Sequence, residues 1–389
     1  MPRIQSLLQR DFASYARGRR RPPHVHRAAR SIMRCRTAAL GGHVMACRAD
    51  HVAGVWYNSC RHRACPQCAK LQIDRWLEGW RQRLLPCDHY HVIFTIPHEL
   101  LGLWQANRKR LSDHLFRASR DTLFELLDDD RYLGARPGLL AALHTWGRTL
   151  TLHPHVRCLV TGGGRAPDGS WRAARGGFLL PVRVVRALFR GKLLAWLRSD
   201  LEDDRLVLPD GVSKAELERA LRRLYSKTWN VRLQQRYAHG HGVVAYLAHY
   251  VRGGPIRDRR LVSATPTTTT FSYTDHRDVR TKRMALPSEE FLRRLFWHVP
   301  EPRSHGVRLY GIYGRRQQAV CEACRAILPD STTTSASKAR RRGSEDPEHP
   351  GIRGRICSIS DEPLASIVDV MSERSDSLRT LLRQRLKSP

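Results

Sequence analysis

The spacing of hydrophobic residues predicts both helices and strands along most of the chain. Apolar residues recur at helical spacing from Asp74 to about Leu85, which predicts a helix there. In the segment HYHVIFTIP, residues 89–97, every second residue is apolar, which predicts a half-buried strand that Pro97 ends. The same reasoning predicts further helices at 104–128, 185–200, 213–226, 241–252 and 289–298, and further strands at 139–146, at 152–160, from Trp229 onward and up to Tyr313.

The segments between these elements carry the residues that turns and loops prefer. A glycine-rich loop is predicted at 162–177, a hairpin in the threonine-rich stretch 265–275, and a firm break at Gly253-Gly254-Pro255. Beyond Asp330 the Ser, Thr, Arg and Pro content predicts a disordered tail, in which 377–387 could form a short helix. Because strands and helices do not alternate regularly, the pattern favours an α+β sheet domain over a doubly wound fold.

Charge changes the picture because the chain is strongly basic. It has 68 Lys and Arg against 36 Asp and Glu, which gives a net charge of +32. The first 330 residues alone hold 57 basic and 28 acidic residues. A folded body with this charge attracts polyanions and releases the counterions of a phosphate backbone, so we expect nucleic acid as a partner. The basic cluster at 17–21 is typical of a DNA-contacting arm or of a solvated leader.

The hydrophobic pattern disfavours membrane-spanning proteins and proteins with a signal peptide. The chain has no apolar run close to the roughly 20 residues that cross a bilayer, and its N-terminus lacks an apolar signal core. We therefore expect no membrane association. Ten cysteines in such a chain suggest metal ligands before disulfides.

Cysteines cluster in the first fifth of the chain. Cys60, Cys65 and Cys68 fall close together, and Cys47 lies a short distance upstream. Thiolates at this spacing can wrap one tetrahedral zinc ion, because a tight turn points the sulfurs inward. Four sulfurs would make a closed, structural site, in which one of them could be replaced by His43, Asp50, His51 or His62. A set of buried free cysteines is the alternative.

A second group of candidate ligands lies in the predicted strand LHPHVRCLV. His153, His155 and Arg157 occupy alternate positions, so a strand would point all three toward one face. Two imidazoles on one face can hold a divalent cation, which would polarise a scissile phosphate. A pair of histidines that simply faces solvent is an equally good interpretation of this segment alone.

The predicted helix at 241–252 carries two tyrosines four residues apart, Tyr246 and Tyr250. Both hydroxyls would lie on one face of the helix, about 5–6 Å apart at Cβ. A tyrosine beside a bound metal can attack a phosphodiester and hold the DNA 5′ end as a phosphotyrosine. A second nucleophile would allow another strand to be cut while the first remains attached. An aromatic pair at this spacing usually serves packing, so the interpretation depends on the histidine strand.

These residues belong to segments that resemble a known family, the two-tyrosine transposases of the insertion-sequence family numbered ninety-one, within the HUH endonucleases. The resemblance spans about residues 31–314 in consistent order. The matching segments are CRTAALGGHV (35–44), YNSCRHRACPQC (57–68), LLPCDHYHVIFTIPHEL (84–100), LHTWGRTLTLHPHVRCLVTGGG (143–164), VVAYLAHYV (243–251), EFLRRLFWHVP (290–300) and VRLYGIYG (307–314).

The resemblance implies an N-terminal zinc-binding domain, followed by a catalytic domain with a central antiparallel sheet flanked by helices. It implies that Tyr246 and Tyr250 are the nucleophiles, that the catalytic metal is Mg²⁺ or Mn²⁺, and that the substrate is single-stranded DNA at transposon ends and target. The expected location is the bacterial cytoplasm, at the nucleoid.

The chain departs from the family pattern at the active site and in the cysteine cluster. Arg157 stands where the second histidine of the family's His-hydrophobic-His element is expected, and a guanidinium has no lone pair for a metal. His153 could stand in, and His144 is a candidate third ligand. Arg157 could instead contact the phosphate directly. Upstream, the family's Cys-x-x-Cys pair is Cys47-Arg-Ala-Asp50 in this chain.

We therefore expect a basic arm at 1–30, a zinc-binding domain at 31–86, an HUH-type catalytic domain at 87–314 and a mostly disordered tail at 315–389. The expected function is a transposase that nicks single strands through a 5′-phosphotyrosine and rejoins them in rolling-circle transposition. There are two alternatives. One is a relative whose catalysis is impaired by Arg157 and that acts as a zinc-dependent DNA-binding protein, and the other is a replication-initiator nickase. The arginines expected to contact DNA are Arg19, Arg20, Arg21, Arg157 and Arg252.

Overall fold

A computed structural model describes most of the chain and divides it into two compact units. Unit 1 comprises residues 1–72, 252–299 and 335–389, and unit 2 comprises residues 73–251 and 300–334. Residues 252–299 therefore pack in unit 1, whereas the boundaries drawn from the sequence place them in the catalytic domain; those boundaries stay a prediction. The residues that the structure describes are 2–17, 21–46, 52–175, 179–234, 236–237, 244, 247–248, 254–275, 278–328 and 365–370.

Unit 1 begins with helices where the sequence predicts a basic arm. Phe12 of the first helix meets Phe296 edge-on and Tyr15 stacks on it, with ring centroids 5.5 Å apart in both pairs. Apolar residues spaced along this helix bury a continuous stripe, which the neighbouring arginines obscure in the sequence, and the predicted arm stays a prediction. The helices that pack together here are α1 (Ile4–Ala16), α2 (Pro23–Arg34) and α9 (Ser288–Trp297).

Small antiparallel sheets complete the described part of unit 1. One has the strand order β12-β1-β2 and the other the order β10-β9-β8. The threonine-rich stretch forms β9, which pairs on both sides instead of closing a simple hairpin. Strand β12 lies where a disordered tail is predicted, and it pairs with β1. The strands are β1 (Gly42–Ala46), β2 (Val52–Tyr57), β8 (Leu261–Ala264), β9 (Thr268–Thr274), β10 (Thr281–Pro287) and β12 (Ala365–Val370).

Unit 2 is built on an antiparallel sheet with the strand order β11-β4-β5-β3-β7, and β6 pairs with the end of β5. Strands and helices follow one another along the chain without a regular alternation, which confirms the predicted α+β class. Its strands are β3 (His89–Thr95), β4 (Arg136–Trp146), β5 (Leu152–Arg165), β6 (Trp171–Ala173), β7 (Val231–Leu233) and β11 (Val307–Gly311).

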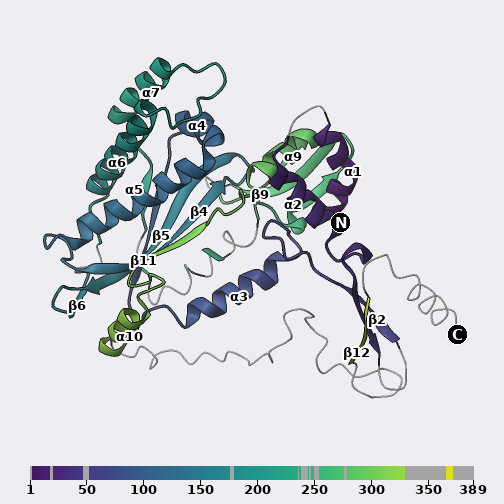
Figure 1. The fold of residues 1–389 in the computed structure, drawn as a ribbon, viewed down its shortest axis with the longest axis horizontal. Helices are drawn as coiled ribbons and strands as arrows, with labels where there is room; N and C mark the ends of the chain where they lie inside the picture. The colour runs from purple at the N-terminus through teal and green to yellow at the C-terminus, as the bar shows by residue number, and fades with distance from the viewer. Residues whose placement is uncertain are drawn as a thin grey trace. The chain divides into compact units, whose positions relative to one another are not determined.

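The two faces of this sheet are covered by different elements (Figure 1). On one face Phe94 of β3 packs against Phe189 of α6 (Val182–Glu202), and α5 (Arg108–Asp128) lies beside α6. The opposite face carries Leu140, Ala142 and Leu159. They are buried in one cluster with Trp80 of α3 (Ala69–Arg81), Tyr313 after β11, and Val244 and Leu247. The predicted helix at 241–252 therefore sends two described apolar residues to this second face.

The helix predicted at 104–128 is split by Asn107. Its side chain donates to the carbonyl of Val207 at 2.7 Å and accepts the Val207 N–H at 2.8 Å. A backbone φ of −130° at Asn107 ends α4 (Leu101–Ala106) and lets α5 begin at Arg108. The apolar pattern passes through this position, so only the distant partner reveals the break.

Strand β5 continues into the glycines that the sequence predicts in a loop. A Cβ atom on Gly164 would lie 2.7 Å from the backbone of Arg136 on β4, closer than side-chain carbon atoms come. The glycines therefore permit close backbone approach inside the sheet, and the loop begins only after Arg165.

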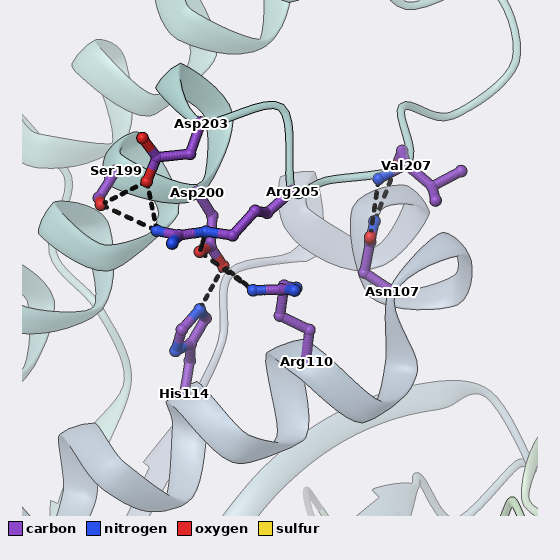
Figure 2. Close-up of polar contacts among 8 residues, drawn as sticks. All are labelled: Asn107, Arg110, His114, Ser199, Asp200, Asp203, Arg205 and Val207. Atoms are coloured by element: carbon purple, nitrogen blue, oxygen red, sulfur yellow. Dashed lines mark hydrogen bonds and ion pairs between the residues drawn. The ribbon is translucent and has the colours of Figure 1, made fainter.

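A buried carboxylate joins α5 to α6, as Figure 2 shows. Asp200 of α6 is 3% exposed. It accepts hydrogen bonds from His114 Nε2 at 2.6 Å, Arg205 Nε at 2.8 Å and Arg110 Nη1 at 3.2 Å. Arg205 also reaches the exposed Asp203 at 2.5 Å. The two helices on this face of the sheet are thus held by charge as well as by apolar packing.

The remaining described helices are α7 (Lys214–Ser226), which a Ser213–Glu216 capping box begins, and α10 (Gln318–Ile327), which the predicted boundaries place in the tail. Short 3₁₀ turns lie at Ala38–Leu40, His98–Leu100 and Asp258–Arg260. The predicted low-complexity tail beyond 328, apart from β12, and the terminal helix at 377–387 lie outside the described residues. Among the helices described, none is long and apolar enough to cross a membrane.

Candidate metal centre and active site

Four cysteines of unit 1 converge on one point. The sulfur atoms of Cys35, Cys60, Cys65 and Cys68 all lie within 4.8 Å of one another. Cys35 follows the last residue of α2, and Cys68 directly precedes α3. Backbone hydrogen bonds from Cys65 to His62 and from Cys68 to Cys65 form the tight turns that point the sulfurs inward.

The spacing of these sulfurs fits a tetrahedral zinc ion. Zinc–sulfur bonds of about 2.3 Å place tetrahedral sulfurs about 3.8 Å apart. The Cys68 sulfur lies 3.5 Å from that of Cys35 and 3.7 Å from that of Cys60. Hydrogen bonds with the neighbouring thiols, followed by burial, raise the pKa of Cys65, so four thiolates can coexist only around a cation that offsets their charge. A zinc ion here would be structural, because four sulfurs leave no position for a substrate.

The described cluster differs from the predicted ligand set at one position. It holds the predicted Cys60, Cys65 and Cys68 together with Cys35, which the sequence does not single out, whereas the predicted set has Cys47. Cys47, Asp50 and His51 lie outside the described residues. The candidates His43 and His62 are not members of the described cluster, and His62 Nδ1 instead accepts the N–H of Ala64. Cys47 is nearer in sequence to the loop of residues 60–68, the zinc knuckle. Only the packing of α2 beside this zinc knuckle brings Cys35 to the other three cysteines.

A cluster of imidazoles lies on the second face of the unit 2 sheet. His144 of β4 and His155 of β5 are directly paired across the two strands. Arg157 lies two residues further along β5 and His91 lies on β3, so sheet alternation places all four on one face. His153 and His155 have ring centroids 5.0 Å apart, as expected for alternate residues of one strand.

Both ring nitrogens of His155 are engaged. Its Nδ1 lies 2.7 Å from the backbone carbonyl oxygen of His153, so this nitrogen donates and Nε2 carries the lone pair. Arg157 Nε donates to that lone pair at 3.1 Å, and His144 Nδ1 lies 2.9 Å from the same atom. The nitrogen through which His155 would bind a metal is therefore directed at Arg157 and His144.

The electrostatics of this face favour neutral imidazoles. Burial, followed by the charge of Arg157, lowers the pKa of His155 to about 3 and that of His91 to about 4. Desolvation and then the charges of Arg157 and Arg232 also lower the pKa of His153, although its ring stays exposed. The face therefore presents fixed positive charge on arginines and uncharged imidazoles near neutral pH.

A divalent cation does not fit this arrangement. Among the described residues, the four cysteines are the group whose ligand atoms come close enough to share a metal ion, and the predicted set of His144, His153 and His155 is not such a group. The His155 lone pair is occupied by an Arg157 donor, and a second cation beside the guanidinium would be repelled. The residues present thus disagree with the Mg²⁺ or Mn²⁺ that the resemblance implies.

Two described residues near the predicted tyrosine pair lie on the face of the imidazoles. Val244 and Leu247 belong to the same buried cluster as Leu140, Ala142 and Leu159. Ala142 is paired with Arg157 across β4 and β5, so these apolar residues share a face with His144 and His155. Tyr246 and Tyr250 themselves lie outside the described residues, as do Arg19, Arg20 and Arg252. Arg21 is described, and its guanidinium stacks on Tyr15 at 4.0 Å from the ring centroid.

Three residues of this face are missing from the sequence-based site. His91 Nδ1 lies 2.6 Å from Gln234 Oε1, so it donates there and the ring is held in one orientation. Arg232 of β7 is paired with Ile93, which is itself paired with Arg157. The segment HYHVIF offers a signal for His91, because an imidazole in an otherwise apolar strand is unusual. No local pattern identifies Arg232 and Gln234, which the pairing of β7 with β3 brings to the site.

Comparisons with known proteins agree with this organisation. Residues 138–320 match the family model described as "Putative transposase", and residues 7–96 match the model of the transposase zinc-binding domain. A protein that carries the first description, y4qJ of Sinorhizobium fredii, is 37% identical over 327 residues, which are 81% of this chain and 82% of that protein. The transposase for insertion sequence element IS801 of Pseudomonas savastanoi pv. phaseolicola is 32% identical over 313 residues, 77% of this chain and 74% of that protein.

Among solved structures, the conjugative relaxase TrwC in complex with mutant oriT DNA is similar over 40% of this chain and 71% of that chain. Its sequence identity is 15% and the TM-score is 0.23, which is too low to support an argument about fold or substrate. The sequence matches are far stronger. The cysteine cluster falls inside the zinc-binding match, and the transposase match contains all of β5 and all but the first two residues of β4. On these matches, the chain belongs to the IS91 family of insertion-sequence transposases.

Proposed function

We propose that this transposase nicks and rejoins single-stranded DNA at the ends of its element, with Tyr246 and Tyr250 as nucleophiles. The observation that carries the proposal is the burial of Val244 and Leu247 on the sheet face of His144 and His155. The other face is covered by α5 and α6, so a tyrosine segment placed there would be separated from the imidazoles by the sheet.

The proposed step balances without a free cofactor. A tyrosine oxygen attacks the scissile phosphorus, the bond from phosphorus to the 3′ oxygen breaks, and the phenol proton is matched by the proton that the 3′ oxygen gains. The DNA 5′ end is then held as a phosphotyrosine, which conserves the energy of the bond. A 3′ hydroxyl of another strand attacks the phosphotyrosine in the reverse sense, which rejoins DNA and frees the tyrosine. The second tyrosine allows a second strand to be held during this exchange.

DNA binding is the other half of the proposal. A net charge of +32 attracts the phosphate backbone over long distances. We assign DNA contacts to Arg19, Arg20, Arg21, Arg157 and Arg252, and we assign the zinc module to recognition of the element ends. The place of action is then the bacterial nucleoid, in the cytoplasm.

The test uses single-stranded oligonucleotides that span the ends of the element carrying this gene, labelled at either the 5′ or the 3′ end. The protein should form a covalent adduct with the 5′ end of the fragment downstream of the nick, which keeps the 3′ label, and should release the 5′-labelled fragment with a free 3′ hydroxyl. The double variant Tyr246→Phe, Tyr250→Phe should lose the adduct and keep DNA binding. Tyr225→Phe is the matched control, because Tyr225 is exposed on α7. An adduct that persists in the double variant would refute the assignment of the nucleophiles.

One observation favours a second candidate function. Arg157 stands at the family's second histidine and engages His155, which could leave a protein that binds element ends without cutting them. DNA binding without an adduct, with and without Mg²⁺ or Mn²⁺, would support this impaired relative over the nicking enzyme.

A further inference from the structure

The guanidinium of Arg157 lies where the family's chemistry calls for a cation. Its Nε donates to His155 Nε2 at 3.1 Å, and His155 is held from its other side by the His153 carbonyl. A metal at this place would need the same lone pair and would stand against a fixed positive charge. Arg157 therefore excludes the ion while bringing a charge of its own to the site.

A second arginine lies on the same face. Ile93 of β3 is paired with Arg157 on one side and with Arg232 on the other. Cross-strand partners point to one face, so the two arginines stand two strand spacings apart, about 10 Å between Cα atoms. Burial, followed by the charges of Arg157 and Arg232, lowers the pKa of His153 on the same face. Long guanidinium side chains at this separation can close on one phosphate from two sides.

We propose that Arg157 and Arg232 form a metal-independent site for the DNA phosphate, in which Arg157 replaces the divalent cation of the family. The proposal deepens the proposed function, because the phosphate bound here is the one that a tyrosine attacks. Two fixed charges stabilise the negative charge that develops on the phosphoryl oxygens, as guanidinium groups do in other phosphoryl-transfer sites. His155 orients Arg157 by accepting the hydrogen bond from its Nε.

The first test measures metal binding instead of activity. Zinc-loaded full-length protein in a buffer freed of other divalent ions is titrated with Mn²⁺, and the paramagnetic resonance signal of free Mn²⁺ is followed. A chelator is avoided because it would also remove zinc from the cysteine cluster. The Arg157→His variant should bind one more Mn²⁺ per chain than the wild type. The added site should disappear in the double variant Arg157→His, His155→Ala.

The matched control is Arg165→His, the same exchange at an exposed position near the far end of β5. It should gain no Mn²⁺. The inference is overturned if Arg157→His gains no Mn²⁺ either. It is also overturned if His155→Ala in the wild-type background loses a bound Mn²⁺, because the wild-type site would then hold the metal.

The second test measures phosphate binding. The affinity for a labelled oligodeoxythymidylate is measured over a series of salt concentrations. Each phosphate contact contributes about 0.7 to the slope of log affinity against log salt for a single strand, so Arg157→Gln and Arg232→Gln should each reduce the slope by about that amount. Slopes that stay unchanged in both variants would overturn the phosphate assignment. So would an equal fall for Arg165→Gln, since the effect would then report overall charge.

Failure of this inference and failure of the proposed function give different results. If Mn²⁺ binding and salt slopes behave as expected but no adduct forms under any condition, the nicking proposal fails and the phosphate site stands. If the wild type forms an adduct only when Mg²⁺ or Mn²⁺ is added, nicking stands and the metal-independent site fails.

Discussion

His155 shows how a buried imidazole can remain neutral and held in place. It is 3% exposed, its Nδ1 donates to the His153 carbonyl, and its Nε2 accepts from Arg157. Alternation along the strand predicts that residues 153, 155 and 157 share a face, and the strand pairing agrees. The alternation says nothing about which imidazole is buried or which nitrogen faces Arg157. Those details depend on the neighbouring strand β4, which supplies His144.

At the residue scale, the cysteine cluster gives a test between two named ligands. Cys35→Ser should lower the zinc content from about one ion per chain to well below one, because only three sulfurs would remain around the ion. Cys47→Ser is the matched control and should keep its zinc. Metal analysis of freshly purified, reduced protein decides the matter. Loss of zinc in Cys47→Ser together with retention in Cys35→Ser would show that Cys47 is the fourth ligand and that Cys35 is not.

At the element scale, the packing of α5 on α6 depends on a carboxylate that neither helix reveals in its own sequence. Burial alone would raise the pKa of Asp200, but the hydrogen bond from His114 and the charge of Arg110 outweigh it, so the pKa lies below its ordinary value. Helical periodicity predicts α6 and most of α5 well, since apolar residues recur on their buried faces. It cannot predict the break at Asn107, where a side chain binds Val207 a hundred residues away.

The contacts of Asp200 between α5 and α6 predict how substitutions there change the free energy of unfolding. Asp200→Asn should lower the free energy of unfolding by about 1–3 kcal/mol, because buried donors lose a charged acceptor. Asp203→Asn is the control: it removes an exposed partner of the same Arg205 and should cost less than about 1 kcal/mol. Urea denaturation followed by circular dichroism measures both. Equal losses of unfolding free energy in the two variants would show that the buried Asp200 stabilises the protein no more than the exposed Asp203 does.

The same Asp200 contacts predict how this stabilisation depends on pH. A folded-state pKa below the ordinary value means that Asp200 contributes its full stabilisation above the unfolded pKa, near about 3.9, and loses it as the pH falls through the lower folded pKa. The difference in unfolding free energy between wild type and Asp200→Asn should therefore shrink as the pH is lowered below about 4. A difference that grows over this range would contradict the assignment of the low pKa.

At the scale of the whole molecule, each unit is assembled from segments distant in the sequence. In unit 1 the N-terminal helix packs on α9, Arg10 donates to the carbonyl of Thr265, and the N–H of Ile4 donates to Asp258. The knuckle approaches residue 254, where a positive φ of +64° suits glycine and an added Cβ atom would lie 3.3 Å from the Ala64 carbonyl oxygen. A linear division of the sequence therefore cuts through contacts that hold the unit together.

This assembly predicts how fragments behave. A fragment of residues 1–86, the predicted zinc domain with its arm, should be markedly less stable than residues 1–72 joined by a flexible linker to 254–299. The first fragment exposes Phe12 and Tyr15, each worth about 1.5–3 kcal/mol when fully buried. Zinc retention during urea denaturation measures the difference. Equal midpoints for the two fragments would mean that 252–299 adds nothing to unit 1.

The sequence by itself determined the family, the α+β class, most helices and strands, and the residue types at the sites, because apolar periodicity and cysteine spacing are local properties of the chain. Tertiary structure alone decided that Cys35 joins the knuckle, that His91 and Arg232 reach the imidazole face, and that Val244 and Leu247 pack there. Strand pairing and helix packing bring distant residues together through contacts that no local pattern records. For that reason the chemistry of Arg157 becomes visible only once β3, β4, β5 and β7 lie side by side.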